Sequence, residues 1–135
     1  MPRLSRWFVR ASLVYLAIGF TLGAILLANK GIDIDPSIWQ VELIHAEILL
    51  VGWLIQLALG VAFWILPRYP QGAPRGNESM IWLAFVLFNL GIGGVTASAI
   101  FGVPGLALAG RVAETGGVLA FIIGSWRRVR PWLPE

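Results

Sequence analysis

Four long apolar stretches constrain this chain more than any other feature. Crossing about 30 Å of hydrocarbon takes roughly 20 helical residues at a rise of 1.5 Å each. Segments near 9–29, 37–66, 79–101 and 105–126 meet that requirement. Hydrophobic residues make up 58% of the 135 residues and charged residues 13%, which is more apolar surface than a soluble core absorbs. The sequence therefore predicts an all-α integral membrane four-helix bundle, one transmembrane domain over residues 1–135.

The ends of these segments carry helix start and stop signals. Asp35 before Pro36 is typical of an N-cap followed by proline at the first helical position. The second segment ends at Leu66 and Pro67, and it is longer than a membrane is thick, so it has to tilt or project outside. Proline and glycine in residues 68–77 prevent the helix from continuing.

The arginines predict the orientation of the spans. They precede the first segment, lie between the second and third, and follow the fourth: Arg3, Arg6, Arg10, Arg68, Arg75, Arg127, Arg128 and Arg130. The positive-inside rule then predicts an up-down-up-down topology with both termini cytoplasmic, in a plasma membrane such as the bacterial inner membrane. The net charge of +3 forms no basic stripe with interleaved aromatics, so we expect the lipid bilayer, and no nucleic acid, as a partner.

Ionisable side chains inside a span are costly and often functional. Glu42, His45 and Glu47 fall near the outer edge of the second segment, and Arg111 and Glu114 lie one to three turns into the fourth. Because both segments begin on the outer side, these groups are predicted to converge in the outer half of the bilayer.

Helical spacing groups several residues of the second segment on one face. They recur every three or four positions: Glu42, His45, Leu49, Gly52, Gln56, Gly60 and Phe63. Such a face suits another helix or a flat cofactor, since glycine lets a partner approach the backbone. The spacing of Gly91 and Gly94 predicts helix packing, and Gln56 and Asn89 are expected to form hydrogen bonds between helices.

The sequence allows two interpretations for each of His45 and Arg111. His45, the only histidine, is either an interfacial side chain bonded to a neighbouring helix or an imidazole ligand to haem iron. Arg111 either neutralises haem propionates or forms an ion pair with Glu114, or with Glu42 or Glu47 across the bundle.

Residues 45–53 (HAEILLVGW) and 60–68 (GVAFWILPR) resemble the second transmembrane helix of the haem-copper oxidase catalytic subunit, and more closely its short four-helix relatives. In that family a histidine near the outer end of this helix ligates the low-spin haem, and a Leu-Pro pair closes the helix. The resemblance implies that His45 is the metal ligand of a non-covalent, b-type haem. We expect Gly52 to give the porphyrin room, Arg111 to bind propionates, and Gln56 and Glu42 to complete the cofactor-binding face.

The chain also departs from that family. Short relatives often have a second histidine at the position of Glu47, and some have one just before Leu-Pro, where Phe63 and Trp64 stand here. The copper ligands, the second haem-ligating histidine and the active-site tyrosine belong to helices that this chain lacks. The resemblance therefore excludes oxygen reduction at a haem-copper centre, and the absence of cysteine excludes covalent haem attachment.

One histidine leaves the iron coordination open. A homo-oligomer, such as a two-fold dimer, would supply His45 from two chains to one haem, whereas a single chain would hold a five-coordinate haem able to bind a small gas. The predicted function is electron transfer, with a redox partner, or gas binding. Two alternatives from other classes are a structural or assembly subunit without a cofactor, and a small transporter with polar residues along a water path.

Overall fold

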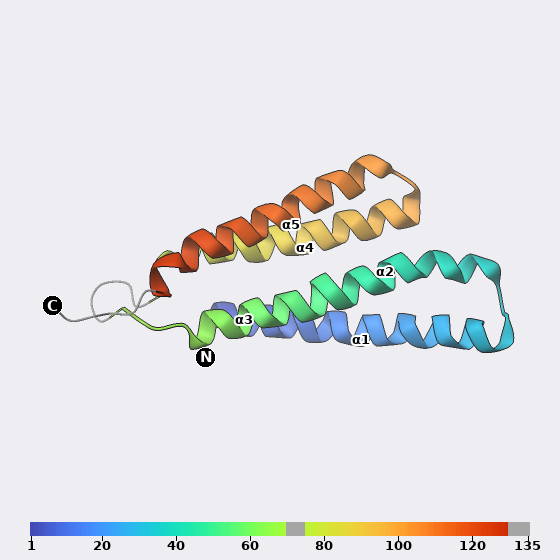
Figure 1. Cartoon of the computed structure of the whole chain (residues 1–135), viewed down its shortest axis with the longest axis horizontal. Helices are drawn as coiled ribbons and strands as arrows, with labels where there is room; N and C mark the ends of the chain where they lie inside the picture. The colour runs from blue at the N-terminus through green and yellow to red at the C-terminus, as the bar shows by residue number, and fades with distance from the viewer. Residues whose placement is uncertain (70–74, 130–135) are drawn as a thin grey trace.

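The computed structural model describes residues 1–69 and 75–129. Over these ranges the chain is helical, with no strand, and four helices are long and apolar enough to cross a membrane (Figure 1). This confirms the predicted all-α class and the presence of four helices suited to spanning a membrane. The helices form two antiparallel hairpins that lie side by side (Figure 1).

The first hairpin pairs α1 with the whole second span. Helix α1 covers Arg3–Ile32, and the second span consists of η1 (Pro36–Gln40), α2 (Val41–Glu47), η2 (Ile48–Ile55) and α3 (Gln56–Ile65). Gly19 of α1 lies against Leu49, and Phe8 of α1 lies against Gly60, so the two spans run in opposite directions. Helix α1 begins six residues earlier than the predicted boundary, since the polar first turn near Arg3 is also helical.

The second span is not the uninterrupted α-helix that its length predicts. It opens with a 3₁₀ turn, and residues Ile48–Ile55 form a π-helix between α2 and α3. A π-helix hydrogen-bonds each residue to the fifth one along, is rare, and frequently lies at functional sites. The wider turn changes which side chains share a face between Glu47 and Gln56, so the α-helical spacing assumed for this stretch does not hold.

The second hairpin is built on glycine. It consists of α4 (Glu78–Phe101), α5 (Pro104–Ser125) and the short η3 (Trp126–Arg128), with Gly102 at φ 66° in the turn. A Cβ atom on Gly110 would lie only 2.7 Å from the carbonyl oxygen of Gly91, and one on Gly94 would lie 3.3 Å from the Cα of Gly110. The predicted packing role of Gly91 and Gly94 is confirmed.

Caps fix the starts of two spans. The Oδ1 of Asp35 accepts a hydrogen bond of 2.8 Å from the backbone N–H of Ser37, with Pro36 at the first helical position, as predicted. The Oδ1 of Asn77 accepts one of 3.1 Å from the N–H of Ser79 at the start of α4. Each cap satisfies a donor that the first helical turn leaves without a partner.

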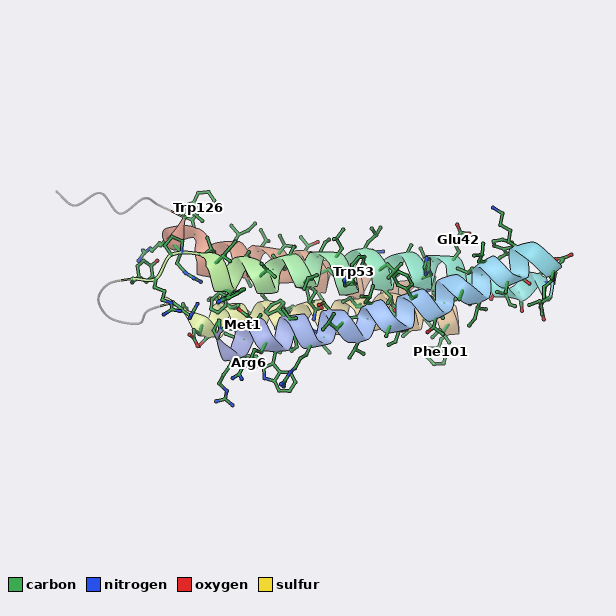
Figure 2. All side chains as sticks on the ribbon, turned by 90° about the horizontal axis from the view of Figure 1, so that it is seen from below. Met1, Arg6, Glu42, Trp53, Phe101 and Trp126 are labelled. Atoms are coloured by element: carbon green, nitrogen blue, oxygen red, sulfur yellow. The ribbon has the colours of Figure 1, made fainter. Side chains whose placement is uncertain are left out.

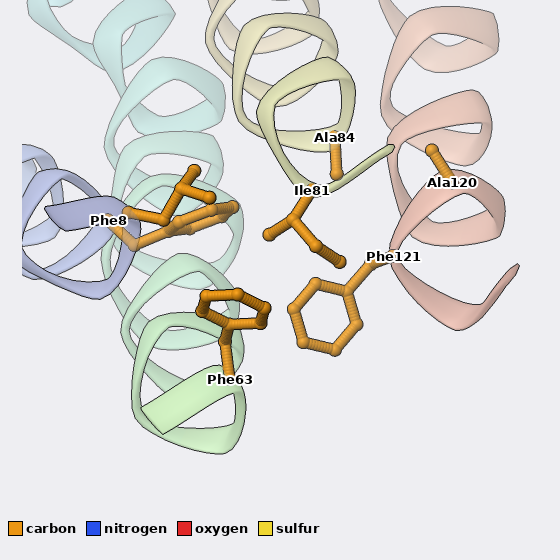
Figure 3. Packing of buried hydrophobic residues seen from close by; sticks show 7 residues of the cluster. Phe8, Phe63, Ile81, Ala84, Ala120 and Phe121 are labelled. Carbon is orange, nitrogen blue, oxygen red and sulfur yellow. The ribbon is translucent and has the colours of Figure 1, made fainter. Parts of the chain in front are cut away.

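An apolar cluster joins all four spans at the end that contains the start of α1. Its buried members are Leu4, Phe8, Phe63, Ile81, Ala84, Ala120 and Phe121 (Figure 3). Phe8 also meets Phe85 edge-on, with ring centroids 5.1 Å apart. At this end the two hairpins share one core.

Polar contacts also join the hairpins. Tyr15 of α1 donates a hydrogen bond of 2.9 Å to the Oδ1 of Asn89 on α4, which agrees with the predicted interhelical role of Asn89. Arg128 is 2% exposed, and its guanidinium donates to the carbonyl oxygens of Phe63, Leu66 and Pro67 at 3.0, 2.6 and 3.0 Å. Arg128 therefore satisfies carbonyls that the end of α3 leaves without helical partners.

Candidate functional site

The imidazole of His45 lies between α2 and α1. Its Nδ1 is 2.9 Å from the backbone carbonyl oxygen of Gly19, which is 26 residues away in the chain. A carbonyl oxygen only accepts hydrogen bonds, so Nδ1 is the nitrogen that donates here, and in the neutral ring Nε2 has the free lone pair. This contact is the interhelical bond that the first reading of His45 predicts, and it also fixes the tautomer that a metal-ligating histidine uses.

Gly23 makes room for this ring. A Cβ atom at Gly23 would lie 2.7 Å from the Cε1 of His45, closer than real Cβ atoms approach, and 3.3 Å from its Nδ1. The imidazole therefore lies directly against the backbone of α1, one turn from the carbonyl that it binds. Sequence reasoning missed Gly19 and Gly23, although their four-residue spacing in a helix of bulky side chains was the available signal.

A cavity of about 390 Å³ opens beside His45. It is lined by Phe20, Gly23, Ala24, Leu27, His45 and Leu49. The lining is apolar apart from the imidazole, and Phe20 and Leu27 are 66% and 71% exposed. The cavity therefore faces outward from the first hairpin rather than into the four-helix core.

A second cavity of about 260 Å³ shares Gly23, Leu27 and His45 with the first. It adds the charged side chains of Glu42 and Lys30, together with Leu26 and Trp39. In Figure 2, Glu42 lies level with Phe101, the last residue of α4, along the long axis of the molecule. The His45 side of α2 is thus near the end of the second hairpin that contains the Gly102 turn, and the first hairpin extends beyond it (Figure 1).

The surroundings of Gly52 and Gln56 differ from those expected of a cofactor-binding face. The ring of Tyr15 fills the space beside Gly52, where an added Cβ would lie 2.7 Å from the Tyr15 Cγ. Gln56 is completely buried, and neither its Oε1 nor its Nε2 has a hydrogen-bond partner within the described ranges. Neither residue lines either of the two cavities described above.

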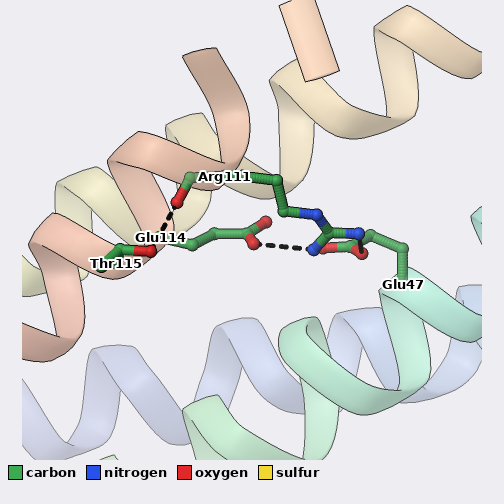
Figure 4. Close-up of polar contacts among 4 residues, drawn as sticks. All are labelled: Glu47, Arg111, Glu114 and Thr115. Atoms are coloured by element: carbon green, nitrogen blue, oxygen red, sulfur yellow. Dashed lines mark hydrogen bonds and ion pairs between the residues drawn. The ribbon is translucent and has the colours of Figure 1, made fainter. Parts of the chain in front are cut away.

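Arg111 belongs to a separate polar cluster across the two hairpins. Its Nη2 lies 2.7 Å from the Oε2 of Glu47 on α2, and its Nη1 lies 2.8 Å from the Oε2 of Glu114, one turn further along α5 (Figure 4). Thr115 donates a hydrogen bond of 2.8 Å to the backbone carbonyl of Arg111. The structure therefore contains the ion pair that was predicted as the alternative to a propionate contact. The guanidinium of Arg111 pairs with the carboxyl groups of both Glu47 and Glu114.

The carboxylates of this cluster are much more buried than the guanidinium. The side chains of Glu47 and Glu114 are 3% and 10% exposed, whereas that of Arg111 is 49% exposed. Gly91 provides the space for Glu114, since a Cβ there would lie 2.5 Å from the Glu114 Cγ. The second oxygen of each carboxylate, Oε1, has no hydrogen-bond partner among the described residues. Within residues 1–69 and 75–129, Arg111 is thus the one cation paired with these two buried carboxyl groups.

The structure divides the predicted site residues into two groups. His45 and Glu42 line adjoining cavities on the first hairpin, whereas Arg111 is bound to Glu47 and Glu114 between the hairpins. Within residues 1–69 and 75–129, no group of three His, Cys, Asp or Glu side chains is placed to hold a metal ion. Comparisons of the chain with protein-family models, with curated proteins and with solved structures gave no match.

Proposed function

We propose that this chain is a membrane protein that binds a non-covalent b-type haem, with His45 as an axial ligand. One observation carries the proposal: Nδ1 of His45 is held by the Gly19 carbonyl, and the same imidazole lines an apolar cavity of about 390 Å³. Porphyrin supplies four nitrogen ligands to its iron, so one imidazole is enough to attach it to the protein.

The residues around His45 fit this group. Apolar walls from Phe20, Ala24 and Leu27 suit the hydrophobic face of a porphyrin, and Gly23 leaves room for the imidazole to stand against α1. The bond to Gly19 fixes the orientation and the tautomer of the ring. When bound, the haem would supply one-electron chemistry or a site for a small gas, while the protein supplies ligation, burial and orientation.

The charged groups near the cavity suggest a revised propionate partner. Lys30 lines the second cavity with Glu42 and His45, whereas the terminal guanidinium nitrogens of Arg111 are bound to carboxylates. We therefore propose Lys30, in place of Arg111, as the cation beside the haem carboxylates. Gly52 and Gln56 have no proposed contact with the haem, because they line neither cavity.

The proposal includes a homo-oligomer and an orientation. The cavity is open on the side where Phe20 and Leu27 are exposed. A second copy of the chain, related by a two-fold axis, would cover this side and place a second His45 beside the same haem. The arginine-rich end would face the cytoplasm, with both termini there, and His45 would lie near the outer face of a bacterial inner membrane. A redox partner would then meet the haem from the outer side.

Haem titration of the purified protein tests the proposal. We expect haem to give a Soret band with the wild-type protein, and His45→Ala to abolish or strongly weaken it. Gly23→Ala should also weaken haem binding, because its Cβ collides with the imidazole, whereas Gly93→Ala is a matched control with nothing within 4 Å of the added atom. A wild-type protein that binds no haem, or a His45→Ala variant that binds it equally well, would contradict the proposal.

A structural or assembly subunit is the second candidate. The cluster of Arg111, Glu47 and Glu114 favours it, because these intramembrane charges already have a role in holding the two hairpins together. This function predicts that substitutions at Arg111 reduce stability or association with a larger complex and leave the optical spectrum featureless in every variant.

A further inference from the structure

A pocket with Arg127 in its wall lies at the end of the molecule opposite the α4–α5 turn. The pocket has a volume of about 450 Å³. It is lined by Tyr69, Gly76, Asn77, Ile123, Gly124 and Arg127. One wall comes from the residues that lead into α4 and the other from the last turn of α5 and η3, so it is separate from both His45 and Arg111. The function proposed above does not use it.

In the sequence, an arginine stands next to a residue of each pocket wall, and one guanidinium nitrogen of each arginine has no hydrogen-bond acceptor among the described residues. Arg75 directly precedes Gly76, and Arg128 directly follows Arg127. The guanidinium carbons of Arg75 and Arg128 lie 5.9 and 4.8 Å from the centre of the same ring, that of Phe63. The Nη1 atoms of both arginines are buried without a hydrogen-bond partner among the described residues, and Arg128 as a whole is 2% exposed.

Positive charge is in excess around this pocket. Arg68 and Arg75 lie close enough to Arg128 for their charges to act on it, and Glu78 is the acidic side chain that opposes them. Arg127 adds a further positive charge in the pocket wall. Asn77 lines the pocket while its Oδ1 caps α4, so only its amide N–H₂ remains as a hydrogen-bond donor. An oxyanion is the kind of ligand that such a set of donors and charges attracts.

The position of the pocket indicates where that oxyanion comes from. Trp64, Trp82 and Trp126 stand at the adjacent ends of α3, α4 and α5, and all three are exposed. Exposed tryptophans at the ends of spans mark the headgroup level of a bilayer. The pocket also combines the apolar Ile123 with the polar Tyr69 and Arg127, which suits a molecule with a charged head on an acyl chain.

We propose that this pocket binds the phosphate group of an anionic phospholipid headgroup. Arg127 and Tyr69 contact the phosphate from the pocket wall, and Arg75, next to Gly76 in the chain, adds positive charge beside it. Arg128 mainly holds the end of α3, and contributes charge rather than a direct contact. The bound lipid would join the connection between the hairpins to the end of α5.

Thermal stability of the detergent-purified protein, titrated with three probes, tests this site. Phosphatidylglycerol should raise the melting temperature in a saturable way, whereas phosphatidylcholine and inorganic phosphate should have little effect. The double variant Arg75→Gln, Arg127→Gln should need about tenfold more phosphatidylglycerol for the same shift, as expected for lost charge-assisted bonds. Arg6→Gln is the matched control: it removes an exposed charge of the same type from the start of α1.

Several results would overturn the proposal. An equal loss with Arg6→Gln would mean that net charge alone attracts the lipid. Inorganic phosphate that competes with phosphatidylglycerol at similar concentration would mean that the site binds free phosphate rather than a lipid. Equal shifts with phosphatidylcholine would exclude selection for an anionic head.

Tyr69→Phe provides a milder variant if the double substitution prevents folding, because it removes one hydroxyl and keeps the ring. Its response to phosphatidylglycerol should be measurably weaker than that of the wild-type protein. An unchanged response would count against the site.

Discussion

The two hairpins use glycine for different purposes. In the second hairpin, Gly117 and Gly124 receive side chains, but an added Cβ on Gly91 or Gly110 would also lie 2.8 or 2.7 Å from a carbonyl oxygen of the facing helix. In the first hairpin, Gly23, Gly52 and Gly60 instead receive side chains, namely an imidazole, a tyrosine ring and a phenylalanine. Backbone contact holds α4 and α5 close together, whereas the side-chain contacts of the first hairpin lie next to the cavities beside His45. The difference suggests that the second hairpin is a scaffold and that the first hairpin is the one that binds a ligand.

The largest expected effect tests the backbone contact directly. Gly110→Ala would place a Cβ 2.7 Å from the Gly91 carbonyl oxygen and 2.9 Å from the Val95 nitrogen, and neither backbone atom can move easily. We expect a loss of about 3 kcal/mol in the free energy of unfolding, measured by denaturant titration in mixed micelles. Gly19→Ala, whose new atom would meet the flexible Leu49 side chain, should lose about 1 kcal/mol. Equal losses at both sites would remove the distinction between the hairpins.

The link between the hairpins is the next test. Arg111→Gln leaves the buried carboxylates of Glu47 and Glu114 without their counter-charge. Because the guanidinium itself is half exposed, we expect a loss of about 2 kcal/mol in unfolding free energy, less than for a fully buried pair. Exposed Arg10→Gln is the charge-matched control, with little change expected.

The same Arg111→Gln variant sharpens the division of roles. Its haem affinity should equal that of the wild-type protein, because Arg111 does not line the His45 cavities. A marked fall in haem affinity would restore the propionate role that the sequence predicts for this residue and would argue against two separate regions.

The smallest effect concerns the tip of the first hairpin. Hydrogen bonds from Ser37 to the exposed Asp35 carboxylate lower the pKa of Asp35 below its usual value of 3.8. A lowered folded-state pKa means that the cap contributes its full stability above the unfolded value and loses it as the pH falls through the lower, folded value. Hydrogen exchange of the amides in η1 should therefore accelerate only in strong acid. Asp35→Asn caps without titrating, so its exchange should lack that acid-dependent step.

Local signals predicted much of the fold. The four long apolar helices, the cap at Asp35 and the helix packing at Gly91 and Gly94 all follow from neighbouring residues and helical period, and all appear in the structure. The π-helix at Ile48–Ile55 could not be predicted in this way, because its apolar sequence fits an α-helix equally well and the wider turn has no local signature.

Contacts between distant segments account for what the sequence did not reveal at the site. The partners of Arg128 lie more than 60 residues away, so the sequence presented it only as a topology signal. Similarly, the carbonyl of Gly19 looks like any other helical carbonyl until α2 packs against it. The two readings of Arg111 were separable only when the distances to Glu47 and Glu114 were known.

Chemical rescue of the proposed ligand tests the central claim most directly. The measurement is the reduced-minus-oxidised absorption spectrum of haem-titrated His45→Gly, without and with free imidazole. We expect the bands of a histidine-ligated haem to be lost in the variant and restored by imidazole, which occupies the vacated volume and binds iron from the same cavity. Wild-type bands in the variant without imidazole, or a wild-type protein that shows no haem bands, would contradict ligation by His45.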